Sequence, residues 1–141
     1  MGDRAYVEIV CRDEDEPLFE AIGFMQEFRH ALPANVVTMV DAEASEGATT
    51  ELQALAEKGI VFRGRHDACG RYDGTCFASA NGEYHEVTRL NHSDLPCIKV
   101  HVDGTVDADQ LLAASEFLKA SDRAGETLGF PSGIEQEDEA P

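Results

Sequence analysis

The chain has 141 residues, of which 43% are hydrophobic, and its 28 acidic and 11 basic side chains give a net charge of −17 at pH 7. This length suits one domain, and the hydrophobic fraction suffices for a core, so the composition excludes a wholly disordered chain. Such a charge repels phosphate backbones and anionic lipids, which argues against direct binding to nucleic acid or to a membrane surface.

The expected location follows from what the sequence lacks. The longest apolar runs are a handful of residues, far below the roughly 20 needed to cross a bilayer, and the opening MGDRAYVEIVCRDEDE has no signal-peptide pattern. We therefore expect a cytoplasmic protein that does not enter membranes. Its four cysteines are expected to be reduced thiols or metal ligands rather than disulfides.

Strands and helices alternate in the first half of the chain. Four acidic residues before Pro17 favour the start of a helix, because carboxylates stabilise the positive end of the helix dipole. Residues 25–35 match no single pattern, and an irregular helix before Pro33 is one interpretation of them. The predicted elements of this half are a strand at 4–11, a helix from Pro17 that ends at Gly23, a strand at 36–41 and a helix at 48–58 capped by Gly59.

From Ile60 onward the hydrophobic period changes to two, which indicates consecutive strands. Asn81 and Gly82 both tolerate a positive φ, so together they predict a tight hairpin. Asp107, with Gln110 three residues later, marks the start of the longest helix. The predicted elements are strands at 60–66, 75–80, 83–89 and 96–103, followed by a helix at 107–128.

This order of elements, βαβα-ββββ-α, predicts a single α+β domain at residues 1–130. Its sheet is expected to be mixed but mostly antiparallel, with the helices packed on one face. Residues 131–141 are acidic and are expected to form a flexible C-terminal tail.

Acidic residues are concentrated towards the two ends of the chain. Residues 1–59 carry a net charge of −9 and residues 102–141 carry −8, whereas residues 60–101 are neutral. Acidic segments attract basic surfaces through long-range steering and complementary charge. We expect the partner-binding surface to include six carboxylates: Glu14, Asp15, Asp41, Glu43, Asp107 and Asp109.

The leading hypothesis is therefore a non-catalytic protein that docks on a basic protein surface, such as that of a nucleic-acid-binding protein. In size and charge the chain resembles the small acidic proteins that phages make to inhibit basic nucleic-acid-binding proteins of the host, including defence nucleases. This resemblance is one of composition. It implies an inhibitor or a nucleic-acid mimic without assigning a role to any residue.

Histidines and cysteines in the neutral segment suggest a different function. His66, Cys69, Cys76 and His85 offer thiolate and imidazole ligands for a zinc site at the tips of the predicted hairpins. The same residue types suit a cysteine nucleophile with a histidine base, but the chain has no established catalytic motif, and no catalytic residue is assigned. Zinc is the cofactor of this alternative, and the leading hypothesis has none.

A third hypothesis is self-association. The segment 24–28 contains two phenylalanines, and an open sheet edge accepts a second strand, so either feature suits the seam of a homodimer.

Overall fold

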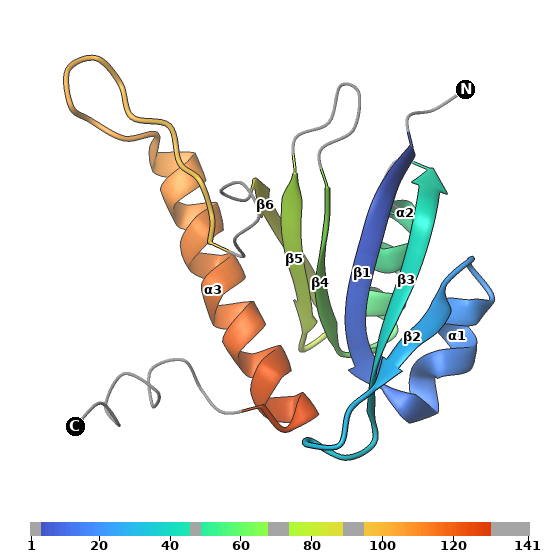
Figure 1. Ribbon diagram of the computed structural model, residues 1–141. Helices are drawn as coiled ribbons and strands as arrows, with labels where there is room; N and C mark the ends of the chain where they lie inside the picture. Colours follow the sequence, from blue (N-terminus) through green and yellow to red (C-terminus); the bar gives the residue numbers. More distant parts are fainter. Residues whose placement is uncertain (1–3, 46–48, 68–73, 89–94, 131–141) are drawn as a thin grey trace.

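The computed structural model describes residues 4–45, 49–67, 74–88 and 95–130. Six strands form one sheet, with the long helix α3 in front of it and α2 behind it (Figure 1). The elements follow one another as β1 (Arg4–Arg12), the 3-10 turn η1 (Asp13–Asp15), α1 (Glu16–Glu20), β2 (Met25–Arg29), β3 (Val36–Ser45), α2 (Thr49–Glu57), β4 (Phe62–His66), β5 (Thr75–Ala80), β6 (Glu83–Thr88) and α3 (Ala108–Leu128).

The sheet has the strand order β2-β3-β1-β4-β5-β6, and every neighbouring pair is antiparallel. β1 pairs with β3 on one side and with β4 on the other. Side chains alternate along a strand, so Val7, Ile9 and Cys11 point to one face while Glu8 and Val10 point to the other. The register of the other strands extends these two faces across the whole sheet.

One face of the sheet, which we call the aromatic face, packs against α1 and α2. The fully buried ring of Phe62 on β4 lies edge-on to Phe19 of α1 and to Phe77 of β5, with centroid distances of 5.5 and 6.1 Å. Edge-on rings gain from their complementary quadrupoles in addition to their burial. Leu52 and Leu55 of α2 complete this core.

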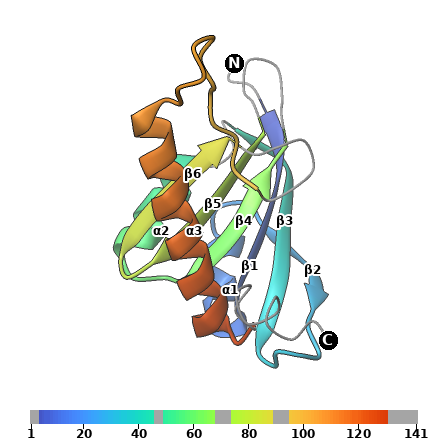
Figure 2. The same cartoon turned by 90° about the vertical axis from the view of Figure 1, so that its left-hand side faces the viewer.

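The opposite face, which we call the α3 face, is built from smaller side chains. Ala78 and Ala80 of β5 meet Phe117 and Ala120 of α3. The helix makes its main contacts with β5 and β6 and fewer with β4, and Figure 2 shows it in front of the sheet, crossing these strands obliquely. Short side chains on both partners let the helix lie close to the sheet.

The α+β class and the mostly antiparallel sheet predicted from the sequence are confirmed. The prediction that the helices share one face is wrong, because α1 and α2 join the aromatic core while α3 packs on the opposite side. The central strands expose apolar residues on both faces, and both have to be covered.

Two strand predictions also differ from the structure. Residues 96–103 form isolated bridges rather than a strand: Pro96 is a bridge residue, and Val100 pairs with Val106 where the chain turns back through Gly104. The segment without a clear pattern contains an additional edge strand, β2, whose five residues are all exposed. An edge strand with no buried side gives no alternating signal.

The predicted hairpin and the longest helix are confirmed. Asn81 and Gly82 have φ values of 55° and 79°, which suit the tight turn between β5 and β6. The Asp107 carboxylate accepts a hydrogen bond of 3.0 Å from the Gln110 N–H at the start of α3. Gly129 ends the helix in the left-handed conformation, with φ at 99°.

No helix within the described ranges is long and apolar enough to span a membrane. The predicted tail at 131–141 lies outside the described residues.

Candidate functional site

The described members of the predicted zinc set do not share one face of the sheet. His66 is buried on the aromatic face, where it pairs with Val7, and its Nδ1 lies 3.3 Å from the Asp67 carbonyl oxygen. Cys76 and His85 both belong to the α3 face. Cys69 lies outside the described residues. In the part of the chain that the structure describes, no three His, Cys, Asp or Glu side chains are grouped to hold a metal ion.

The thiol of Cys11 is unsuited to nucleophilic catalysis. Burial raises its pKa to about 12, and the negative charges of Asp15 and Glu16 act in the same direction. The thiolate is the reactive form, so this cysteine is inert at neutral pH. Its sulfur lies 3.9 Å from that of Met39, within the aromatic-face core.

Glu14 and Asp15 are two predicted interface residues that the structure brings together. Both belong to η1, directly after β1, and Glu16 follows them at the start of α1. We call Asp13–Glu16 the acidic turn. Burial raises the pKa of the Asp15 carboxyl, and the neighbouring charge of Glu14 raises it further. The acidic turn therefore concentrates negative potential at one end of the molecule.

Arg29 of β2 holds the two outer carboxylates of the acidic turn. Its Nη1 lies 3.0 Å from Oδ2 of Asp13, and its Nη2 lies 3.6 Å from Oε1 of Glu16. Glu14 is 69% exposed, and its nearest arginine partner, Arg12, is 3.8 Å away. Such a long, exposed pair contributes little, so Glu14 presents its charge to the solvent, while Asp15 beside it is partly buried.

Asp107 and Asp109 lie at a different end of the molecule. They stand at the start of α3, whereas Leu128 at the other end of this helix lines the same hollow as Glu14. The helix has 21 residues, which corresponds to a length of about 30 Å. A single partner interface of ordinary size is therefore centred either on the acidic turn or on the start of α3.

The third predicted pair lies on β3. The Asp41 side chain is close to the turn after α1, because a Cβ added at Gly23 would lie 2.9 Å from its Oδ2. The side chain of Glu43 lies outside the described part of the structure. The six predicted carboxylates thus lie on three separate elements.

A groove that was not predicted from the sequence lies on the α3 face, between α3 and strands β1, β3 and β4. Its volume is about 410 Å³. We call it the arginine groove, because two arginines of β4 point into it. The residues that line it include Glu8, Val10, His30, Thr38, Arg63, Arg65, Phe117, Ser121 and Phe130.

Arg63 is fixed at the boundary between the groove and α3. Its Nη1 donates a hydrogen bond of 3.1 Å to the Ser121 carbonyl, and its guanidinium lies 5.0 Å from the centre of the Phe130 ring. Arg65, two residues along the same strand, lies 3.4 Å from the Glu8 carboxylate. The two guanidinium groups therefore share one face of the sheet at neighbouring positions.

One end of the groove is lined by residues that are distant in sequence. His30 Nε2 lies 2.9 Å from the hydroxyl oxygen of Thr38, and the His30 ring packs edge-on between Phe28 and Phe130. One signal could have located the groove: within the predicted strand 60–66, Arg63 and Arg65 alternate with the apolar Phe62. That spacing places both arginines on the face opposite the aromatic core.

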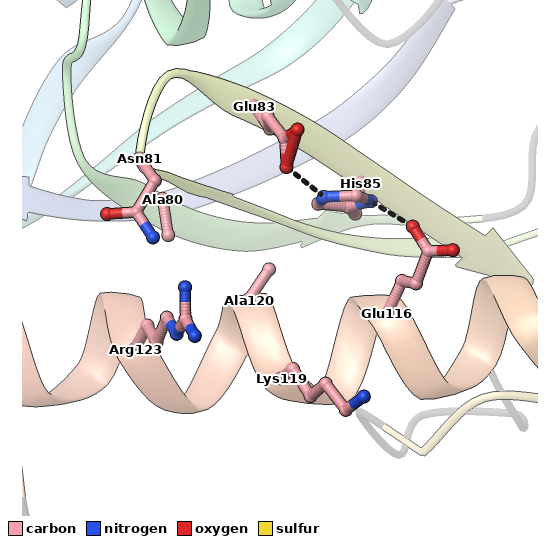
Figure 3. Close-up of a pocket in the computed structure, with 8 residues that line it drawn as sticks. All are labelled: Ala80, Asn81, Glu83, His85, Glu116, Lys119, Ala120 and Arg123. Carbon is pink, nitrogen blue, oxygen red and sulfur yellow. Dashed lines mark ion pairs between the residues drawn. The ribbon is translucent and has the colours of Figure 1, made fainter.

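A smaller hollow of about 150 Å³ lies between β6 and α3 (Figure 3). His85 stands there between two carboxylates, with its Nε2 3.5 Å from Glu83 and its Nδ1 3.8 Å from Glu116. Lys119 and Arg123 of α3 line the same hollow. The pair with Glu116 links the edge strand β6 to α3, whereas Glu83 belongs to the same strand as His85. Both pairs are long and partly exposed, so they contribute little stability.

The chain has no match among protein-family models, curated proteins or solved structures. The acidic turn and the arginine groove are therefore the two features on which a function has to be based.

Proposed function

We propose that this is a non-catalytic binding protein that docks on a basic surface of a protein partner through its acidic turn. The observation that carries this proposal is the run of four consecutive carboxylates at Asp13–Glu16, with no basic residue in η1. Arg29 holds the outer two. The inner two, Glu14 and Asp15, remain available to a partner.

The charge of the whole chain supports the same partner class. With a net charge of −17, the protein attracts a basic surface from a distance and accelerates encounter with it. Basic nucleic-acid-binding proteins offer such surfaces. An inhibitor that occupies the phosphate-binding groove of such a protein is the specific form of this proposal.

The test is an affinity measurement at low and high salt. Immobilised wild-type protein captures a basic binding partner, which is then purified and titrated against wild type and against a Glu14→Lys, Asp15→Lys variant. Exposed charges are screened over about 10 Å at 0.1 M salt, so we expect affinity to fall steeply as salt increases. The double reversal is expected to weaken binding at least tenfold while changing the melting temperature only slightly.

The matched control reverses two exposed carboxylates of α2, Glu51 and Glu57, neither of which is among the predicted binding residues. It changes the net charge of the chain by the same amount as the first variant. Equal losses in both variants would mean that net charge alone determines binding, and salt-insensitive capture would contradict the whole proposal.

A second candidate function, self-association, is favoured by the edge strand β2. All five of its residues are exposed, and Met25 and Phe28 are 65% and 54% exposed. Natural edge strands are usually protected against pairing by charge or cover. Sedimentation at several concentrations tests this candidate: Phe28→Lys is expected to convert a dimer to a monomer, and a monomeric wild type at all concentrations would exclude it.

A further inference from the structure

The arginine groove has the size and lining of a small-molecule site. Its volume of about 410 Å³ falls within the range of about 300–1,000 Å³ that is typical of such sites. Val10, Phe117 and Phe130 supply apolar walls, while the guanidinium groups are the convergent polar groups that fix a ligand's orientation.

The charge inside the groove is opposite in sign to that of the molecule. Arg63 and Arg65 line it together with one carboxylate, that of Glu8, whereas the whole chain carries a net charge of −17. Electrostatic interactions are stronger in a partly enclosed, low-dielectric site than in water. The groove is therefore a local attractor for anions on a protein that otherwise repels them.

Gly125 of helix α3 leaves room for the Arg63 side chain. A Cβ added at Gly125 would lie only 2.6 Å from Nη1 of Arg63, so the guanidinium occupies space that any other residue would fill. Among the residues, only proline is worse than glycine inside a helix. A glycine in the last third of a 21-residue helix thus accommodates Arg63 against the helix, beside Phe130.

We propose that the arginine groove binds a small organic acid that has one carboxylate and a short apolar body. Arg63 and Arg65 hold the carboxylate, because guanidinium groups match carboxylate geometry, and the apolar body lies against Val10 and Phe117. Glu8, 3.4 Å from Arg65, repels a second negative charge. It therefore disfavours phosphate esters and dicarboxylates.

This site shares no residue with the acidic turn, which consists of Asp13–Asp15 of η1 and Glu16 of α1. A protein that loads an organic acid into the groove can still dock on a basic partner. Failure of one proposal therefore leaves the other intact.

Three probes of equal chain length test the charge preference: octanoate, 1-octanol and octylammonium. Each is titrated into the ¹⁵N-labelled full chain and followed by amide chemical shifts. We expect saturable octanoate binding with the largest shifts around Val10, Arg65 and Ser121, and at least tenfold weaker binding of the other two probes. No octanoate binding, shifts centred elsewhere, or equal binding of 1-octanol would overturn the proposal.

Arg65→Gln tests the contribution of the guanidinium. It is expected to raise the Kd for octanoate about tenfold or more, since hydrogen bonds to charged groups are the stronger class. Arg123→Gln is the matched control, because it removes the same charge from the hollow in Figure 3. An unchanged Kd in Arg65→Gln, or an equal loss in both variants, would contradict the assignment. The wild-type probe series decides the charge preference even if a variant fails to fold.

Discussion

The two faces of the sheet carry different kinds of side chain. On the aromatic face, the Phe62 ring packs edge-on to Phe19 of α1 and to Phe77 of β5, and each of the three is at most 1% exposed. On the α3 face, alanines contact the helix, and beside them lies a groove with two arginines. A buried ring removes more apolar area from water than a buried alanine, so we expect the aromatic face to contribute more to stability than the α3 face.

The side chains that form the main core and the side chains that line the groove therefore lie on opposite faces of one sheet. Each strand contributes to both, because alternate residues point to opposite faces. On β4, Phe62 belongs to the core while Arg63 and Arg65 belong to the groove. Substitutions at adjacent positions, such as Phe62 and Arg63, are therefore expected to have unrelated effects.

The largest expected effect comes from the centre of the aromatic face. Phe62→Ala removes a fully buried ring and leaves a cavity, so it should lower the free energy of unfolding by about 3–5 kcal/mol. Phe117→Ala on the α3 face should cost less, about 2–3 kcal/mol, because its site adjoins a groove and can relax. Urea denaturation measures both. A larger loss of unfolding free energy for Phe117→Ala than for Phe62→Ala would mean that the α3 face contributes more to stability than the aromatic face.

An intermediate effect is expected at Gly125, and it depends on Arg63. Gly125→Ala places a methyl group against the Arg63 guanidinium, and moving this end of the side chain should cancel the gain of about 1 kcal/mol that alanine brings to a helix interior. Thermal unfolding measures the net effect.

The control for this prediction is the same substitution in an Arg63→Ala background. Without the guanidinium, Gly125→Ala should stabilise the helix by about 1 kcal/mol relative to the single Arg63→Ala variant. An equal effect in both backgrounds would mean that the glycine serves some purpose other than accommodating Arg63.

The smallest expected effect is a dependence on pH at the acidic turn. Burial and the charge of Glu14 raise the pKa of Asp15 above its ordinary value of 3.8, so the folded state favours the protonated form. The resulting stabilisation is present below pH 3.8 and is lost as pH rises through the folded-state pKa. Asp15→Asn should therefore raise the melting temperature at pH 7. The corresponding gain in unfolding free energy should be less than about 1 kcal/mol, and it should vanish below pH 3.8.

Asp103 provides a control of opposite sign. Hydrogen bonds from the side chain and the backbone N–H of Thr105 lower the pKa of its carboxyl. Its contribution is present above pH 3.8 and is lost as pH falls, so Asp103→Asn should lower the melting temperature at pH 7. Identical pH profiles for the two variants would count against both assignments.

The elements with local signals were predicted from the sequence. α3 has its N-cap at Asp107 and its left-handed end at Gly129, and the hairpin has two residues of positive φ at Asn81 and Gly82. These signals depend on neighbouring residues only. Sequence spacing is therefore enough to locate them.

The strand β2 and the arginine groove depend on tertiary contacts. β2 is exposed on every side chain, so it lacks the alternation that marks a half-buried strand. The groove joins residues far apart in the chain, such as His30, Arg63 and Phe130. Which residues face one another across a sheet and a helix follows from packing, which no local pattern records.

The chain position of α3 bears on how the protein is assembled during synthesis. This helix follows all six strands, whereas α1 and α2 are interleaved with them. A chain that emerges from the ribosome with its N-terminus first can close the aromatic face once β6 has appeared, while the α3 face is still open to water. Arg63 then meets Ser121 and Phe130 only in the last step, so the walls of the groove are completed after the sheet that forms its floor.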